Sequence, residues 1–179
     1  MSQHDFKPAS LFYKRPSKSA RILYNGCGCF VILMILTAIA LPSFLASSNK
    51  SKQSQGKQYI GSMNRAQQAK FAENGSFSNF IPDLGLGLKT ETNNYKYSTR
   101  ATKRTAFNYG VSKQKIEKSY IGGVFVVPAK EVDANAAKDE ITTSSILCEA
   151  DDRGTIEPAE PIYQNGKLIC GKGTTAVTK

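Results

Sequence analysis

The chain has 179 residues, 24 of them Lys or Arg and 14 Asp or Glu, which gives a formal net charge of +10 at pH 7. This length accommodates one ordinary domain with an additional segment. Because His4 is the only histidine, a catalytic triad or metal site built on histidine would lack its usual side chains. We therefore predict that the protein is not an enzyme and uses no metal or other cofactor.

A long uncharged stretch follows a basic N-terminal tail. Between Arg21 and Lys50 there is no Asp, Glu, Lys, Arg or His, and residues 27–46 are almost wholly apolar. Twenty helical residues rise about 30 Å, which is the thickness of a bilayer core. We predict a basic tail over residues 1–26 and a transmembrane helix in contact with membrane lipid over residues 27–46.

Two other interpretations of this stretch stay open. A buried core helix would usually show a polar face, whereas only Thr37 and Ser43 interrupt the apolar run. A cleavable secretory signal would share the basic residues before the run but would have a shorter apolar core. Within the predicted span, Pro42 removes a backbone donor, which predicts a kink of the membrane helix near residues 38–42.

The four cysteines form two groups. Cys148 and Cys170 are far apart in the polar C-terminal part, without the paired spacing of a zinc site, and we predict a disulfide between them. A disulfide indicates an oxidising compartment, so residues 76–179 are expected in the periplasm, in a lumen or at the cell surface, with the basic tail in the cytoplasm. Cys27 and Cys29 lie at the start of the apolar run, where they are either small apolar residues or sites of modification.

The segment after the span has the period of a helix. We predict an amphipathic extension of the first helix over residues 47–75. It ends at Asn74-Gly75, because glycine readily adopts the left-handed conformation that closes a helix. Its narrow buried stripe is predicted to consist of Ile60, Met63, Gln67 and Phe71.

Beyond residue 75 the chain consists of short runs with strand character, separated by turn residues. This pattern predicts an α+β fold in which the long N-terminal helix packs on a small antiparallel sheet. The leucines of residues 77–88 are expected to pack on the helix, and residues 129–140 to form a helical turn or a surface loop. The candidate strands are Tyr95–Thr99, Ala106–Val111, Gly123–Val127, Ser145–Glu149 and Lys167–Cys170.

Three motifs together resemble type IV pilin-like proteins of the cyanobacterial type, with similarity over residues 35–97. The resemblance implies a long N-terminal helix, half hydrophobic and half packed on an antiparallel sheet, often with a disulfide loop near the C-terminus. The motifs are Ala-Ile-Ala-Leu-Pro-Ser-Phe-Leu at residues 38–45, Tyr-Ile-Gly-Ser-Met-Asn-Arg-Ala-Gln-Gln-Ala at 59–69 and Glu-Asn-Gly-Ser-Phe at 73–77.

The prepilin peptidase motif of this family is degenerate here. Prepilins carry Gly-Phe-Thr-Leu-Ile-Glu before the apolar run and are cleaved after the glycine. In this chain Ala20 takes the glycine position and Asn25 the glutamate position, and no acidic residue occurs between Asp5 and Glu73. In a filament that glutamate is expected to pair with the N-terminal amine of a neighbour in an apolar core. Removal of the tail and ordinary polymerisation are therefore both open.

These features favour a single-pass, pilin-like membrane protein that acts as a structural or accessory component of a type IV pilus, a pseudopilus or a related membrane complex. The expected partners are other pilin-like or membrane-complex subunits, contacted along the first helix. The alternative is a constitutive docking subunit of another membrane assembly that retains a pilin-derived fold.

A third hypothesis is nucleic-acid binding, as in a DNA-binding minor pilin. Basic and aromatic residues together hold phosphates and stack on bases. The same alternation is typical of a half-buried hairpin, with its aromatic residues in the core and its charges in water. The candidate contacts are Lys96, Arg100, Lys103 and Arg104, interleaved with Tyr95, Tyr97, Phe107 and Tyr109.

Acidic residues gather in the C-terminal part. Glu149, Asp151 and Asp152 precede Gly154, but their spacing does not follow a calcium-loop motif, and a solvated turn explains them equally well. Residues 47–130 hold fourteen basic and four acidic residues, whereas residues 131–179 hold five basic and nine acidic ones. Such opposed charges could steer subunits together, although an ordinary solvated surface has the same composition.

Overall fold

The computed structural model describes residues 50–177. No helix in this part of the chain is both long and apolar enough to cross a membrane. The predicted basic tail, the transmembrane helix and its kink at Pro42 lie outside the described residues, as do Cys27 and Cys29.

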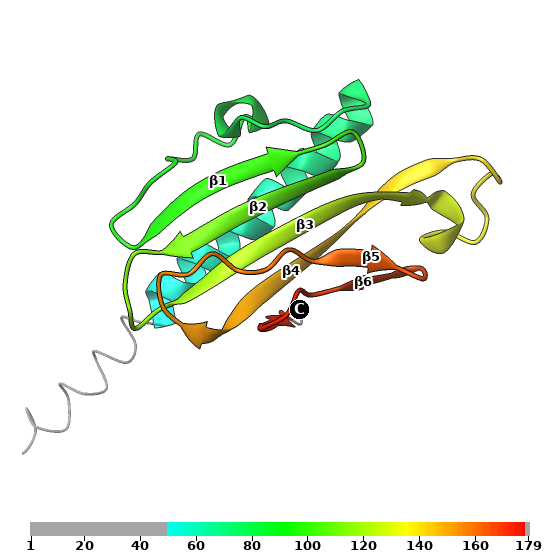
Figure 1. Cartoon of the computed structure of the whole chain (residues 1–179). Helices are drawn as coiled ribbons and strands as arrows, with labels where there is room; N and C mark the ends of the chain where they lie inside the picture. The colour runs from blue at the N-terminus through cyan, green and yellow to red at the C-terminus, as the bar shows by residue number, and fades with distance from the viewer. Residues whose placement is uncertain (1–49, 178–179) are drawn as a thin grey trace, which may run out of the picture. The chain divides into compact units, whose positions relative to one another are not determined.

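The described residues form an α+β domain with one long helix and a small antiparallel sheet, as the sequence predicts. The helix occupies residues 50–74. The main sheet has the order β1-β2-β3-β4-β7, and all neighbouring strands are antiparallel (Figure 1). The strands are β1 Tyr95–Ala101, β2 Thr105–Ser112, β3 Lys118–Pro128, β4 Ile141–Arg153 and β7 Thr174–Ala176.

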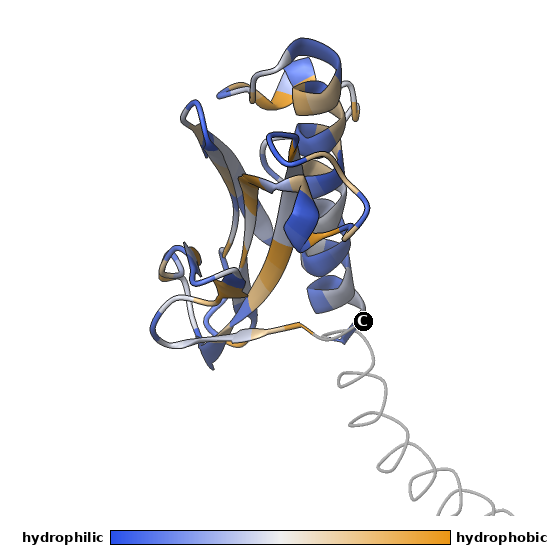
Figure 2. Ribbon diagram, turned by 90° about the vertical axis from the view of Figure 1, so that its right-hand side faces the viewer, coloured by the Kyte–Doolittle hydropathy of each residue, from blue (hydrophilic) through white to orange (hydrophobic). Residues whose placement is uncertain are grey.

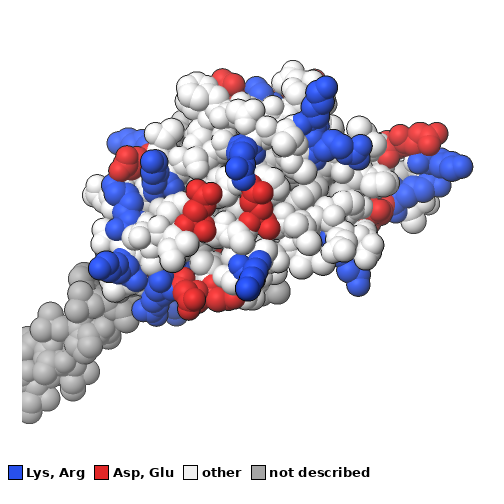
Figure 3. Space-filling model, viewed as in Figure 1, with Lys and Arg blue, Asp and Glu red and all other residues white. Residues whose placement is uncertain are grey.

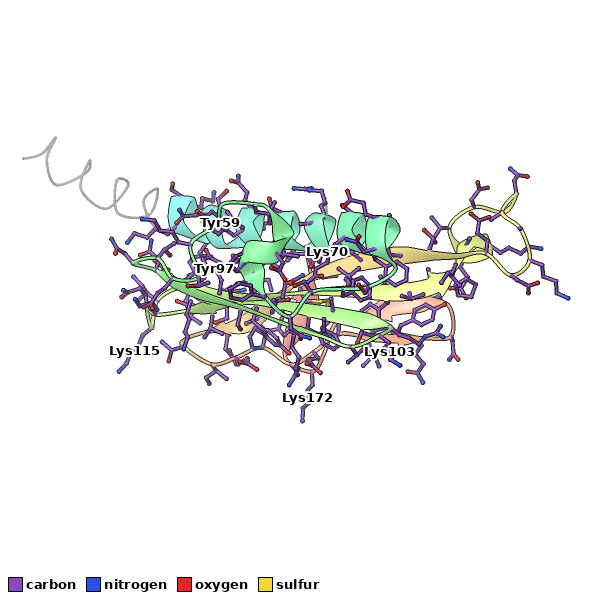
Figure 4. All side chains as sticks on the ribbon, turned by 90° about the horizontal axis from the view of Figure 1, so that it is seen from above. Tyr59, Lys70, Tyr97, Lys103, Lys115 and Lys172 are labelled. Atoms are coloured by element: carbon purple, nitrogen blue, oxygen red, sulfur yellow. A yellow bond between two sulfur atoms is a disulfide. The ribbon has the colours of Figure 1, made fainter. Side chains whose placement is uncertain are left out.

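The helix covers one face of the main sheet, and part of the C-terminal segment covers the other (Figures 2 and 4). This segment contains a second, two-stranded sheet of β5 (Ile162–Gln164) and β6 (Lys167–Ile169). Asn165 and Gly166 join the two strands with φ values of 52° and 75°. Two successive positive φ angles are what a two-residue type I′ hairpin turn requires, and Asn-Gly adopts them readily.

The helix buries one stripe against the sheet, because its apolar and amide side chains recur every three or four residues. Phe71 is half-buried at the end of this stripe and packs on Phe77, with ring centroids 4.8 Å apart. The helix ends as predicted, since Gly75 has a φ of 67° and its amide donates to the Phe71 carbonyl at 2.8 Å. The fully buried members of the stripe are Gly56, Ile60, Met63, Asn64 and Gln67.

Two apolar cores lie on opposite faces of the main sheet. The core under the helix contains the predicted contact between the post-helix leucines and the stripe, and Leu84 belongs to the 3-10 helix η1 (Ile81–Leu84). The second core lies under the C-terminal segment and contains Cys148 and Cys170. The first core gathers Ile60, Met63, Ile81, Leu84, Tyr95, Tyr97 and Tyr120, with Leu86, Leu88 and Leu147 beside it.

The strands agree with the sequence in position but differ in length. β1 and β2 match the predicted hairpin closely, whereas β3 and β4 extend well beyond the predicted Gly123–Val127 and Ser145–Glu149. β3 is buried on both faces over residues 119–127, so its serine and glycines stand among apolar residues. The strands β5 and β7 were not predicted, and residues 129–140 form the short 3-10 helix η2 (Ala129–Glu131) and a loop.

Candidate interaction surface

The first half of β4 has an unpaired edge. β7 pairs only with Cys148–Ala150 of β4, and the Val177 amide then donates to the Leu147 carbonyl at 2.9 Å. Within residues 50–177, no strand pairs with the part of β4 before Leu147 on the side away from β3. Alternate residues of a strand direct their N–H and C=O groups to the same side. The backbone groups of Thr143 and Ser145 therefore face this open edge, as those of Leu147 do.

A groove of about 580 Å³ lies between the helix and this edge. Two of its lining residues, Lys57 and Arg65, are basic, and none is acidic. A Cβ atom at Gly61 would meet no atom within 4 Å outside the helix's own backbone, so the groove is open beside the helix at this point. Its lining residues come from the helix (Ser54, Lys57, Gln58, Gly61, Asn64, Arg65 and Gln68), from β4 (Ser145, Ile146 and Leu147) and from Val177. We call this groove, with the open edge of β4, the β4-edge surface.

Amide side chains of the helix fix the β4-edge surface in place. Gln68 donates to the Thr143 carbonyl at 3.1 Å and accepts from the Ser145 hydroxyl at 3.2 Å. Asn64 donates to the Ile146 carbonyl at 2.9 Å. These bonds attach the helix directly to β4, the fourth strand in the order of the main sheet.

A buried chain of hydrogen bonds continues from Asn64 across the sheet. Asn108 of β2 donates to Asn64 at 2.9 Å, and Thr99 of β1 donates to Asn108 at 2.8 Å. Gln67 donates to Thr99 at 3.0 Å and to the Ser78 carbonyl at 2.7 Å. Because buried amides are costly when unsatisfied, this chain fixes how the helix lies on the sheet.

The sequence predicts this buried chain of hydrogen bonds only in part. Gln67 belongs to the predicted stripe, and Asn64 is adjacent to Met63 in it, so helical periodicity could have placed both at the sheet. Asn108 lies on a half-buried strand between apolar neighbours, and nothing in its sequence context distinguishes it from a solvent-facing position.

Glu117 is a fully buried carboxylate in the loop between β2 and β3. Neither of its oxygens accepts a hydrogen bond from the described residues. The nearest cation is Lys52 of the helix, whose Nζ lies 3.8 Å from Glu117 Oε1. Burial raises the pKa of Glu117, and the Lys52 charge offsets part of this effect. Nothing in the sequence singles out Glu117, because it lies in a polar, lysine-rich loop.

The residues proposed for nucleic-acid contact occupy separate environments. Arg100 of β1 donates to the Glu160 carboxylate and, at 2.8 Å, to the Tyr109 hydroxyl. Its guanidinium carbon lies 5.7 Å from the centroid of the Tyr109 ring. Lys96 is exposed on the same strand, and Lys103 lies in the turn between β1 and β2 with Arg104.

The aromatic residues interleaved with these cations belong to the two cores. Tyr95 and Tyr97 lie under the helix, while Phe107 and Tyr109 lie under the C-terminal segment. This is the arrangement that the half-buried-hairpin interpretation predicts. Lys and Arg side chains are interspersed with Asp and Glu on the face seen in Figure 3.

The acidic residues of the C-terminal part are also dispersed. Glu149 accepts from Lys118 at 2.8 Å and from the Tyr120 hydroxyl at 2.9 Å. Asp151 accepts from the Thr175 hydroxyl at 2.5 Å, whereas Asp152 lines a separate small cavity. No group of three residues able to hold a metal ion occurs in the part of the chain that the structure describes.

A disulfide joins Cys148 of β4 to Cys170, the pair that the sequence predicts, with their Cα atoms 5.8 Å apart. It closes a loop with a sequence separation of 22 residues, which contains β5 and β6. A disulfide of this span stabilises a fold by roughly 3 kcal/mol in the chain-entropy description. It holds the C-terminal segment on the face of the sheet opposite the helix.

The family model of type IV pilin-like G and H proteins matches residues 53–171 of the chain. The matched segment includes nearly all of the described helix, the strands β1 to β6 and both cysteines of the disulfide. No curated protein and no solved structure matches the chain.

Proposed function

Because the chain belongs to the type IV pilin-like G and H family, we propose that it is a non-enzymatic structural or accessory subunit of a type IV pilus, a pseudopilus or a related membrane complex. The family match across helix and sheet is the observation that carries this proposal. The β4-edge surface supports it, since an unpaired strand edge can be extended by a strand of a neighbouring subunit.

The proposal includes a single membrane anchor. Residues 27–46 form an uncharged apolar run of bilayer length, and the domain that follows them contains a disulfide, which persists in oxidising compartments. The basic tail is then cytoplasmic and the sheet domain lies outside the cytoplasm. Contacts between subunits inside the membrane would use the small residues of the first helix, with Pro42 setting its direction.

A constitutive docking subunit of another membrane assembly is the second candidate. The observation that favours it is the degenerate peptidase motif, in which Ala20 and Asn25 replace the residues needed for cleavage and for pairing in a filament. Such a subunit would keep its tail and remain in the membrane.

The intact mass of the membrane-extracted protein, together with its distribution between cell fractions, tests these alternatives. A processed filament subunit would lack residues 1–20 and would be recovered in sheared surface material. An accessory or docking subunit would keep its full mass, stay with the membranes and co-purify with its partners in fixed ratio. Recovery of the full-length chain as a monomer without any partner would contradict both candidates.

Ser145→Pro tests the role of the β4-edge surface in assembly. Proline removes the outward-facing N–H of position 145 and is tolerated where that group does not serve the sheet. We expect fewer cross-links to neighbouring subunits in intact cells. Ser145→Ala is the matched control, because it removes the hydroxyl and keeps the N–H, and it should assemble like the parent. Equal cross-linking of the proline variant would exclude strand addition at this edge.

A further inference from the structure

The loop between β2 and β3 lies at the end of the domain where the predicted anchor joins it. Only three residues separate Ala46, the last residue of the apolar run, from Lys50, where the described helix starts. The four Cα–Cα steps from Ala46 to Lys50 span at most about 14 Å. Lys52 of the helix in turn lies 3.8 Å from Glu117 in the loop. Chain connectivity therefore keeps this loop close to the membrane surface if residues 27–46 span the bilayer.

The loop combines cations with an exposed apolar side chain. Residues 113–117 read Lys-Gln-Lys-Ile-Glu, and the side chain of Ile116 is 51% exposed. Lys115 is exposed and points away from the domain at the end from which the helix starts (Figure 4). An apolar side chain between cations is typical of a segment that contacts the boundary between lipid headgroups and acyl chains.

The acidic groups at this end pair with lysines other than Lys115. Glu91 is paired with Lys113 at 2.5 Å, and Glu149 is paired with Lys118 at 2.8 Å. The Glu117 carboxylate is buried beneath the loop instead of being presented on its surface. Among the described residues, no ion pair involves Lys115, so its charge is available for an external anion.

We propose that residues 113–117 form a second membrane contact, in which Ile116 enters the headgroup boundary and Lys115 binds anionic lipid headgroups. This inference rests on the proposed single membrane anchor. The contact would fix the tilt of the domain over the bilayer, because it adds a second point of attachment beside the helix. A protein partner at this loop is the competing occupant.

The chain contains no tryptophan, so Ile116→Trp introduces a unique fluorescent probe at the loop. The full-length variant is reconstituted into phosphatidylcholine vesicles with and without phosphatidylglycerol, using lipids brominated along the acyl chain. Val132→Trp is the matched control. Its side chain is 63% exposed in the loop after β3, and the eleven residues of β3 place it about 36 Å from the proposed contact.

We expect the indole at position 116 to emit at shorter wavelength and to be quenched at least about twofold more strongly than the indole at position 132, most clearly in the anionic vesicles. Adding Lys115→Gln to the Ile116→Trp variant should reduce the quenching in anionic vesicles towards the value in neutral ones. Lys103→Gln in the same background should leave it unchanged, because Lys103 lies at the opposite end of the sheet (Figure 4).

Equal quenching at positions 116 and 132 would overturn the lipid contact. If the protein also resists carbonate extraction from the vesicles, the anchor and the proposed function stand without it. Extraction by carbonate would instead refute the anchor itself, and the lipid contact with it. If the loop is protected from solvent only in native membranes and the indole at position 116 is not quenched in vesicles, the loop contacts a protein partner. That result would also overturn the proposed lipid contact.

Discussion

The side-chain N–H of Asn108 donates to the side-chain oxygen Oδ1 of Asn64 at 2.9 Å, in the interior between β2 and the helix. The Asn64 amide also fills the space above Gly122 of β3, where a Cβ atom would overlap Asn64 Oδ1. The absence of a side chain at Gly122 is thus what allows a polar helix residue to reach the backbone of β4.

Gly122→Ala should lower the free energy of unfolding by about 3 kcal/mol, because the added methyl group displaces the Asn64 amide from its two hydrogen-bond partners. Thermal or denaturant unfolding of the detergent-solubilised full chain measures this loss. Asn64→Ala alone should cost about 2 kcal/mol, since it leaves the Asn108 amide unsatisfied.

The double variant Gly122→Ala/Asn64→Ala is the informative control. The new methyl group then occupies the space that the amide vacates, so the combined loss should fall short of the sum of the two single losses by about 1 kcal/mol or more. Strictly additive losses would show that the two residues do not compete for the same space.

Gly56→Ala and Gly61→Ala should have opposite effects, although both replace a helical glycine. A Cβ atom at Gly56 would lie 2.8 Å from Cζ of Tyr95, whereas one at Gly61 would have no neighbour within 4 Å. We expect the first substitution to destabilise the domain by about 1–3 kcal/mol through overpacking. The second should stabilise it by about 0.5–1 kcal/mol through higher helix propensity. Circular dichroism melts of both variants would decide, and a loss of stability in each would contradict the prediction.

The buried Glu117 predicts a dependence of stability on pH. Its pKa in the folded protein is raised above the ordinary value of 4.5 by burial, with Lys52 acting in the opposite direction. As the pH rises above 4.5, the unfolded chain releases its proton before the folded chain does. The carboxyl group therefore contributes most favourably at low pH, and this contribution is lost as the pH rises through the folded-state pKa.

Glu117→Gln removes this titration and keeps the shape of the side chain. The variant should be more stable than the parent at pH 7, by about 1 kcal/mol, and the difference should shrink as the pH approaches 4. Melting temperatures across this range provide the test. Lys52→Met should enlarge the penalty at neutral pH, because it removes the only cation near Glu117 in the described chain. A stability difference independent of pH would argue against a buried charge.

Replacing Cys148 and Cys170 together by serine should lower the free energy of unfolding by roughly 3 kcal/mol. Denaturant titration without added reductant compares this double variant with the parent protein. Reduction of the parent should lower its denaturation midpoint towards that of the variant. If reduction leaves the parent's midpoint unchanged, the C-terminal segment is held by its packing on Tyr109 and Ile121 alone.

Periodicity predicts the helix because its buried positions recur on one face and Gly75 ends it. The hairpin of β1 and β2 is predictable for a similar reason, since residues alternate between core and solvent in β1. The disulfide follows from two isolated cysteines. These features depend on local patterns, which a single sequence records.

The remaining features depend on contacts between distant segments. β5 and β7 have three residues each, too few for a pattern to develop, and their pairing depends on the disulfide and the Asn-Gly turn. β4 extends across polar residues such as Thr142 and Thr143 because β3 offers it a long partner. The burial of Asn108 and Glu117 likewise depends on which helix residues arrive above them.

The disulfide also determines what a protease can do to this domain. Arg153 and Lys167 are exposed and lie between Cys148 and Cys170 in sequence. A trypsin-like enzyme that cuts after either residue leaves two fragments still joined through sulfur, so a nicked chain runs as one species until it is reduced. Cleavage at either residue would therefore not release the C-terminal segment, and a cut subunit could keep its place in an assembly.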